Sequence, residues 1–288
     1  MMCVWDGFQA RGNLLNSFSH KDAQRTQDMS KLSAIIITKN EEERLPRCLN
    51  SVRFAEQMII VDSGSTDRTA AIARTCGAEV FSEDWKGYTV QKNSALEKSG
   101  GDWVLSLDAD EELSEEAQTE IQSLLREDDR KVQAYAFRRK VFYLGKWIYH
   151  GDWYPDDVVR LWRRGSGKFE GGRVHESVRV NGVVKHLESE ILHYTYKDLG
   201  DQNERIQKYA KLWALDHFEA KRVSSMTDLW LRPPWRFLRA IVFKAGWLDG
   251  WRGWLIAWMC AREVLLKYRN LRDLQRNSMA RTVFQKNS

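Results

Sequence analysis

Two aspartates, Asp108 and Asp110, follow an apolar run that begins at Trp103. Carboxylates this close together can hold a hard divalent cation such as Mg²⁺ or Mn²⁺, which takes one or two of them and completes its shell with water and diphosphate oxygens. The same Asp-x-Asp would also cap a following helix, and a lone motif of this kind more often does so. Its place after the fourth of four strand-like runs favours the metal site.

Two more polar clusters follow apolar runs: Thr38–Glu41 comes after three isoleucines, and Asp62–Asp67 comes after Met58–Val61. Carboxylates accept N–H and O–H donors strongly, so Asp62 suits a nucleobase and a ribose. Helix capping is the alternative, and it is the interpretation that we favour for Asp67.

The elements that must position these clusters follow from periodicity. From Leu32 to about Asp110, short β-branched runs alternate with amphipathic helical stretches, the pattern of βαβ units in a parallel sheet. Ligands bind at the carboxyl ends of such strands, where all three clusters fall. We therefore predict an α/β fold, a Rossmann-like, mostly parallel sheet flanked by helices. Asn40 and Glu43 have the pattern of a capping box for the first helix. The expected strands are Leu32–Thr38, Met58–Val61, Glu79–Phe81 and Trp103–Leu107.

Composition narrows the class of protein. Hydrophobic residues make up 43% and charged residues 30% of the 288 residues, and the formal net charge is +5. These values are near globular averages, exclude wholesale disorder, and give no indication of a nucleic-acid partner. The segment from Thr38 to Glu43 contains no glycine, which removes the main support for a dinucleotide or P-loop phosphate site. The four cysteines form no Cys-x-x-Cys pair and fit a reducing cytosol.

Together, three runs resemble glycosyltransferase family 2, whose members have a GT-A fold: Ile35–Glu41, Ile60–Asp67 and Leu107–Glu111. The match is specific because all three occur in order and at suitable spacing. The resemblance implies a metal site for Mg²⁺ or Mn²⁺ at Asp108, Asp110 and His193. It also implies a nucleotide-sugar site at Thr38, Asn40, Glu41, Asp62, Lys92, Asn93, Asp108 and Arg160.

Later motifs resemble the branch that includes lipopolysaccharide-core β-glucosyltransferases acting on heptose: Trp153–Asp156 with Arg160–Arg164, Val174–Glu176, and His193–Tyr196. The branch implies transfer of a hexose, glucose from UDP-glucose, to a lipid-linked saccharide of the lipopolysaccharide core or a related surface glycan, with inversion to a β-linkage. A sugar-nucleotide pyrophosphorylase and a non-catalytic membrane-bound scaffold of a glycan assembly complex are the alternatives.

An inverting transfer needs a carboxylate that takes the proton of the acceptor hydroxyl. Asp156 is the first candidate, and Asp157 and Glu176 are the others. Each of the three has the alternative of a salt bridge to a nearby arginine. Arg160 and Arg163 would steady the diphosphate or lie in solvent, and His175 would orient Glu176 or simply pack.

We divide the chain into residues 1–28, a disordered tail or mis-assigned start, residues 29–195, the GT-A catalytic domain, and residues 196–288, a helical extension facing a membrane. Arg232-Pro233-Pro234 is expected to break the helical pattern. The longest apolar run, Gly253–Ala261, is about half of the roughly 18 to 20 residues that a spanning helix needs.

The extension carries four tryptophans at spacings of four, three and four, which lie on one face if the helix is continuous; they are Trp247, Trp251, Trp254 and Trp258. Indoles favour the headgroup zone, and nearby arginines favour anionic lipid. We predict peripheral attachment to the cytoplasmic face of a bacterial inner membrane. A helical hairpin packed on the catalytic core is the alternative.

Overall fold

The computed structural model describes residues 30–172 and 176–286. The predictions for residues 1–28 and for His175 lie outside the described residues.

The first half of the described chain alternates strands and helices as the periodicity predicts. The order is β1 (Leu32–Thr38), α2 (Leu45–Ser51), β2 (Gln57–Asp62), α3 (Thr69–Thr75), β3 (Glu79–Ser82), α4 (Tyr88–Glu97) and β4 (Trp103–Asp108). These four strands pair in parallel in the order β3-β2-β1-β4. The four predicted strands are therefore confirmed, with ends within one residue or so of the predicted ones.

The next segment adds antiparallel and mixed pairing to this sheet. Its elements are β5 (Glu111–Leu113), α5 (Glu115–Glu127), β6 (Val132–Tyr143), β7 (Lys146–Trp147), the 3₁₀ turn η1 (Gly151–Trp153), β8 (Asp157–Arg163), β9 (Gly167–Gly171), β10 (Glu176–Val180) and β11 (Val183–His193). Beyond β4 the order continues β8-β6-β11-β5, and β9 and β10 form a separate hairpin. Strand β8 runs antiparallel to β4 and pairs with its first half, with Arg163 opposite Trp103.

Alternation along the strands divides the core between two faces of the sheet. Ala34, Ile36 and Ile60 pack with α2, α3 and α5. Ile35 and Ile59 pack on the other face, toward α4 and the β9–β10 hairpin. Helices thus cover both faces, and the carboxyl ends of the parallel strands stay open at one edge.

The capping box predicted at Asn40 and Glu43 is wrong. Helix α2 begins only at Leu45, with Pro46 in its first turn and no side-chain cap. Asn40 is held at φ 55° instead, and its side-chain oxygen accepts a hydrogen bond from the Thr66 N–H at 2.8 Å. The residue ties the turn after β1 to the turn after β2, a use that local spacing does not reveal.

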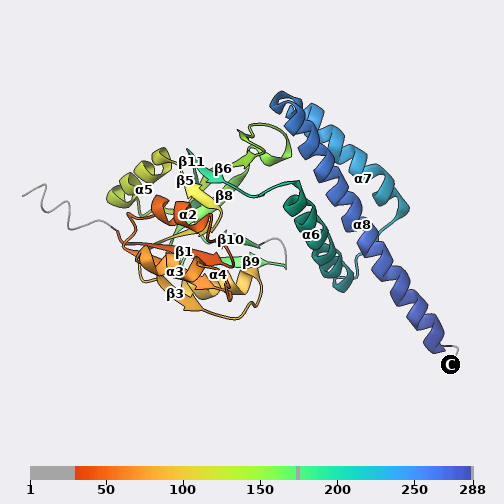
Figure 1. The fold of residues 1–288 in the computed structure, drawn as a ribbon, viewed down its shortest axis with the longest axis horizontal. Coiled ribbons are helices and arrows are strands. Elements are labelled where there is room, and N and C mark those ends of the chain that lie inside the picture. Colours follow the sequence, from red (N-terminus) through yellow and green to blue (C-terminus); the bar gives the residue numbers. More distant parts are fainter. Residues whose placement is uncertain (1–29, 173–175, 287–288) are drawn as a thin grey trace, which may run out of the picture.

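After β11 the chain becomes helical. The extension contains α6 (Leu199–Glu219), α7 (Met226–Leu238), the π-helical turn η2 (Arg239–Phe243), the 3₁₀ turn η3 (Gly246–Asp249) and α8 (Trp251–Lys286). These helices stand together beside the sheet, with α8 packed against both α6 and α7 (Figure 1). Of the helices within the described ranges, none is both long and apolar enough to cross a membrane.

The expected break at Pro233 and Pro234 is also wrong, because α7 continues through both. The interruption falls earlier, between Glu219 and Met226, where Ser225 accepts a hydrogen bond from the Asp228 N–H and caps the new helix. Pro233 and Pro234 have no backbone N–H and so cannot donate the usual hydrogen bonds of a helix interior. The packing of α7 on α8 outweighs this loss.

One apolar cluster joins the extension to the sheet. Val141 and Tyr143 of β6 and Ile148 pack against Ile256 and Cys260 of α8. The extension is therefore seated on the end of β6, close to the segment that leads into β8.

Candidate active site

The carboxyl ends of three parallel strands meet as predicted. Thr38 of β1 lies opposite Asp62 of β2, and Ile37 lies opposite Asp108 of β4. The three polar clusters, far apart in the sequence, therefore share one edge of the sheet.

Asp108 lies between two buried cations. Its carboxylate contacts Lys92 Nζ at 2.7 Å and Arg160 Nη2 at 2.8 Å. Lys92 reaches this site from α4 with only 4% of its side chain exposed, and it also contacts Glu176 at 2.9 Å. Burial disfavours the charge on Asp108, but Lys92 and Arg160 outweigh it and hold the pKa of that carboxyl far below its usual range. Asp108 is thus a fixed anion.

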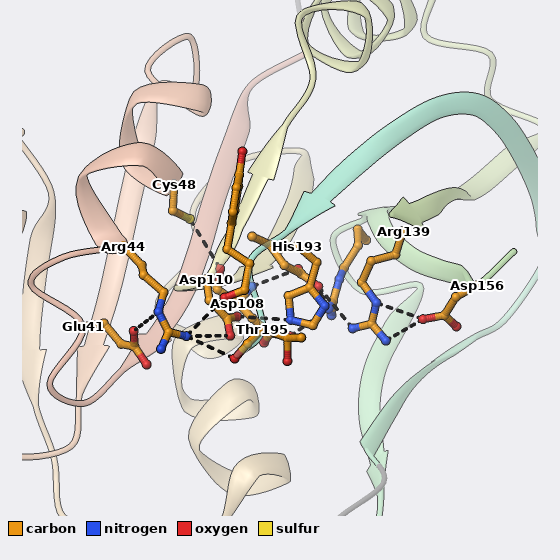
Figure 2. A network of polar contacts seen from close by, with 12 residues as sticks. Glu41, Arg44, Cys48, Asp108, Asp110, Arg139, Asp156, His193 and Thr195 are labelled. Carbon is orange, nitrogen blue, oxygen red and sulfur yellow. Dashed lines mark hydrogen bonds and ion pairs between the residues drawn. The ribbon is translucent and has the colours of Figure 1, made fainter. Parts of the chain in front are cut away.

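Glu111 extends this cluster toward Asp156. Its fully buried carboxylate contacts Arg160 at 2.6 Å and Arg139 at 3.3 Å. Arg139 in turn contacts Asp156 at 2.6 Å, and Figure 2 shows its guanidinium pointing toward that carboxylate. Asp156 is therefore linked to Asp108 through two arginines and a glutamate.

Asp110 belongs to a second group of contacts. One carboxylate oxygen lies 3.5 Å from His193 Nε2, and the other lies 3.2 Å from Arg44 Nη1. Burial raises the pKa of Asp110, yet His193 and Arg44 outweigh burial and the net shift is downward. Arg44 also contacts Glu41 at 3.5 Å and lies between the two acids in Figure 2. In Glu41 burial prevails over the arginine, and its pKa is raised.

The predicted metal-ligand set is only partly assembled. Asp110 and His193 face each other, whereas both oxygens of Asp108 are taken by Lys92 and Arg160. No group of three His, Cys, Asp or Glu side chains suited to a metal occurs in the part of the chain that the structure describes. Asp110 and His193 alone fit a hard cation whose other positions go to diphosphate and water.

Two buried hydroxyls lie at the ends of β1 and β2. Thr38 Oγ1 and Ser63 Oγ have no hydrogen-bond partner among the described residues. They lie side by side, since the Ser63 N–H donates to the Thr38 carbonyl at 2.9 Å. Asp62 is buried next to them and accepts hydrogen bonds from the N–H and hydroxyl of Ser65. Unsatisfied buried hydroxyls are costly, so this pair of hydroxyls suits a polar ligand.

Three predicted residues have other roles in the structure. Asn93 exchanges two hydrogen bonds of 3.0 Å with the backbone of Phe169 and so holds β9 against α4. Asp157 is exposed and lies 3.5 Å from His186, outside the buried cluster. Arg163 lies opposite Trp103, at the far end of β4, because β8 runs antiparallel. It therefore cannot reach a diphosphate at the Asp108 end.

Sequence reasoning missed several members of the site. Glu111 stands within the Asp108 motif but had no assigned role, and Arg44 and Arg139 are in stretches without any motif. Arg205 of α6 was also missed: burial disfavours its charge, yet Asp201 and Asp110 raise its pKa. Their decisive contacts are distant in the sequence: Arg44 lies 66 positions from Asp110, and Arg139 lies 28 positions from Glu111.

The buried pairs around Arg160 predict a large stability effect. Arg160→Met leaves Asp108 and Glu111 with one cationic partner each, and we expect a loss of about 3–5 kcal/mol in the free energy of unfolding, measured with urea. Arg68→Met is the control, since Arg68 pairs with Glu42 at 82% side-chain exposure and should cost about 0–1 kcal/mol. Equal losses in both variants would show that water solvates the Asp108 cluster.

Comparisons with known proteins agree with this architecture. Residues 33–181 match the family model of glycosyl transferase family 2. An uncharacterized glycosyltransferase of Rickettsia prowazekii (strain Madrid E) is 31% identical over 267 residues, covering 87% of this chain and 89% of that protein. The lipopolysaccharide core biosynthesis glycosyltransferase LpsC of Rhizobium meliloti (strain 1021) is 32% identical over 238 residues, covering 78% and 86% of the two chains.

Among solved structures, a mannosyltransferase of Pyrobaculum calidifontis in complex with GDP-Man and Mn²⁺ overlaps at a TM-score of 0.47 and 15% identity, over 93% of this chain and 88% of that one. At this distance the overlap carries nothing about substrate. The family model and the full-length relatives decide the assignment, and the sheet with its flanking helices has the GT-A arrangement. The chain belongs to glycosyltransferase family 2.

Proposed function

We propose that this glycosyltransferase moves a hexose, glucose from UDP-glucose, to a lipid-linked saccharide of the lipopolysaccharide core or a related surface glycan, with inversion to a β-linkage. The observation that carries the proposal is the convergence of Thr38, Asp62 and Asp108 at one edge of the sheet. The similarity to LpsC supports the class of acceptor. The choice of glucose and UDP rests on the resemblance of the Trp153–Asp156 motif to core β-glucosyltransferases.

The chain's own residues suit the parts of a nucleotide sugar. Thr38 and Ser63 would bind the nucleoside through their unpartnered hydroxyls, beside Asp62. Asp110 and His193 would hold Mg²⁺ or Mn²⁺, which supplies positive charge to the departing diphosphate. Arg205 lies on α6, and the charge of Asp110 helps to raise its pKa. It would contribute a further cation beside Asp110.

A transfer assay tests the proposal. Purified protein, Mn²⁺ and radiolabelled UDP-glucose are mixed with glycolipid extracted from cells in which the gene is deleted. We expect label in the glycolipid and release of UDP, with lower rates for UDP-galactose, UDP-N-acetylglucosamine and GDP-mannose. Release of pyrophosphate would favour a pyrophosphorylase, and absence of turnover with every donor would favour a scaffold.

We also propose that the extension attaches the enzyme to the cytoplasmic face of a bacterial inner membrane. Trp247, Trp251, Trp254 and Trp258 are each about half exposed, from 48% to 58%. Gly250, at φ 64°, separates η3 from α8, so the tryptophans do not share one continuous helix. Trp230, Trp235 and Phe243 of the same extension are exposed as well, at 71%, 56% and 68%, and we name these seven side chains together the aromatic face. Exposed aromatic side chains on helices that also carry arginines fit an interfacial site.

Vesicle sedimentation tests the attachment. Trp251→Ala/Trp258→Ala should bind phosphatidylglycerol vesicles about tenfold more weakly than the unaltered chain, because indole burial drives interfacial binding. Trp85→Ala is the control, since Trp85 is 47% exposed but lies in the loop before α4. Equal binding by the double variant and the control would rule out the aromatic face as the membrane contact.

A further inference from the structure

A single buried carboxylate connects the extension to the catalytic domain. Asp152 lies in η1, and none of its side chain is exposed. Its oxygens lie 2.7 Å from Arg236, 2.8 Å from Arg239 and 3.4 Å from Lys244. All three cations belong to the corner where α7 passes into η2 and η3.

Backbone contacts hold the same corner to η1. The Gly151 N–H donates to the Lys244 carbonyl at 2.9 Å, and the His150 N–H donates to Asp249 Oδ2 at 2.8 Å. A Cβ on Gly246 would lie 3.4 Å from Gly151 Cα, so the two backbones approach closely. The start of the segment that enters β8 is therefore held by the extension as well as by β6.

The other end of this segment reaches the active site. Asp156 follows Asp152 by four residues and contacts Arg139, which contacts the buried Glu111. Between them, Trp153 packs edge-on against Tyr143 of β6 with ring centroids 5.1 Å apart. On the sheet side, both the guanidinium and the backbone N–H of Arg139 hold Asp156, and on the extension side the Asp152 cluster holds the start of the segment that leads to it.

Asp152 compensates the positive charges of the corner formed by the end of α7, η2 and η3. Three cations share one carboxylate, and no other described carboxylate forms an ion pair with Arg236, Arg239 or Lys244. Without that anion the three would repel one another, and without them the buried carboxylate would have no compensation. The cations keep 35% to 40% of their side chains exposed. Phe243 and Trp247 of the aromatic face belong to the same turns, η2 and η3.

We propose that Asp152 is a positioning residue, which makes the placement of Asp156 depend on the lipid-facing corner of the extension. This inference rests on the proposed function for its effect on transfer, but not for its effect on structure. It predicts that loss of Asp152 loosens residues 148–157 and slows the transfer step, while the proposed nucleotide site around Thr38, Asp62 and Ser63 remains intact.

The experiment compares full-length Asp152→Asn and Asp152→Glu with the unaltered chain by hydrogen–deuterium exchange, UDP titration and transfer kinetics. In Asp152→Asn we expect faster exchange in residues 148–157, unchanged UDP affinity, and a kcat lowered by on the order of 10²-fold, the effect of a displacement of about 1 Å. Asp152→Glu keeps the charge and should recover most of the kcat. Asp228→Asn is the matched control: it removes a carboxylate paired with Arg232 on α7, away from η1.

A second variant guards against loss of folding. Arg239→Gln leaves Arg236 and Lys244 on Asp152 and should give the same pattern with smaller amplitude. Unchanged exchange in residues 148–157 of both variants overturns the inference, as does an equal loss of UDP affinity and kcat. If the unaltered chain transfers no sugar, the proposed function fails, whereas the exchange result still decides whether Asp152 holds the segment.

Discussion

Asp110→Ala is expected to lower the rate of transfer by on the order of 10³-fold or more and to abolish metal-dependent UDP binding. The Asp110 carboxylate is 13% exposed and stays ionised between His193 and Arg44. We expect the divalent cation at Asp110 because this acid faces His193 and its contact with Arg44 is looser, 3.2 Å, than the 2.7 and 2.8 Å contacts of Asp108 with Lys92 and Arg160. Its loss removes the charge that would hold the metal against the departing diphosphate.

Isothermal titration with UDP, with and without Mn²⁺, measures this effect beside the transfer rate. Glu112→Ala is the matched control, because Glu112 lies two residues after Asp110, on β5, and pairs with the half-exposed Arg47. The control should bind UDP as the unaltered chain does, and thermal unfolding should show both variants folded. Undiminished turnover in Asp110→Ala would remove the metal assignment. UDP binding that needs no metal in the unaltered chain would do the same.

The second large effect concerns the base. Asp156→Asn is expected to lower kcat by about 10²–10⁴-fold, the range for a general base, with little change in UDP affinity. Asp156 is about one-third exposed and linked through Arg139 to the buried cluster, so it can meet an acceptor from solvent while staying fixed.

Glu176→Gln and Asp157→Asn complete the comparison. Glu176 is held by Lys92, and its loss leaves Lys92 with Asp108 alone. Asp157 faces His186, so we expect Asp157→Asn to leave kcat nearly unchanged. If Asp156→Asn keeps kcat within threefold of the unaltered value while Glu176→Gln loses about 10²-fold, Glu176 rather than Asp156 is the base.

Local pattern was enough to predict the parallel half of the fold. Strands β1 to β4 are β-branched runs with helices between them, and their carboxyl ends meet in any right-handed parallel sheet. The convergence of Thr38, Asp62 and Asp108 follows from that rule alone. Family membership rests on the same three motifs, which is why it could be inferred before the structure.

Local pattern failed where distant segments compete for a residue. Asn40 has the sequence of a helix cap but bonds to Thr66, 26 positions away. Pro233 and Pro234 have the sequence of a helix break but lie inside α7, which packs on α8. In both cases a tertiary contact outweighs the local preference.

The tertiary structure alone decided which charges meet. Three arginines from separate elements each pair with a different aspartate: Arg44 with Asp110, Arg139 with Asp156, and Arg160 with Asp108. Sequence spacing does not predict these pairs. Buried ions must be paired, and the pairing depends on which strands lie side by side and in which direction. The sequence by itself determined the sheet edge at which chemistry takes place. The antiparallel strand β8, the strand β11 and the helical extension decided which residues reach that edge, because their positions depend on packing between segments far apart in the chain.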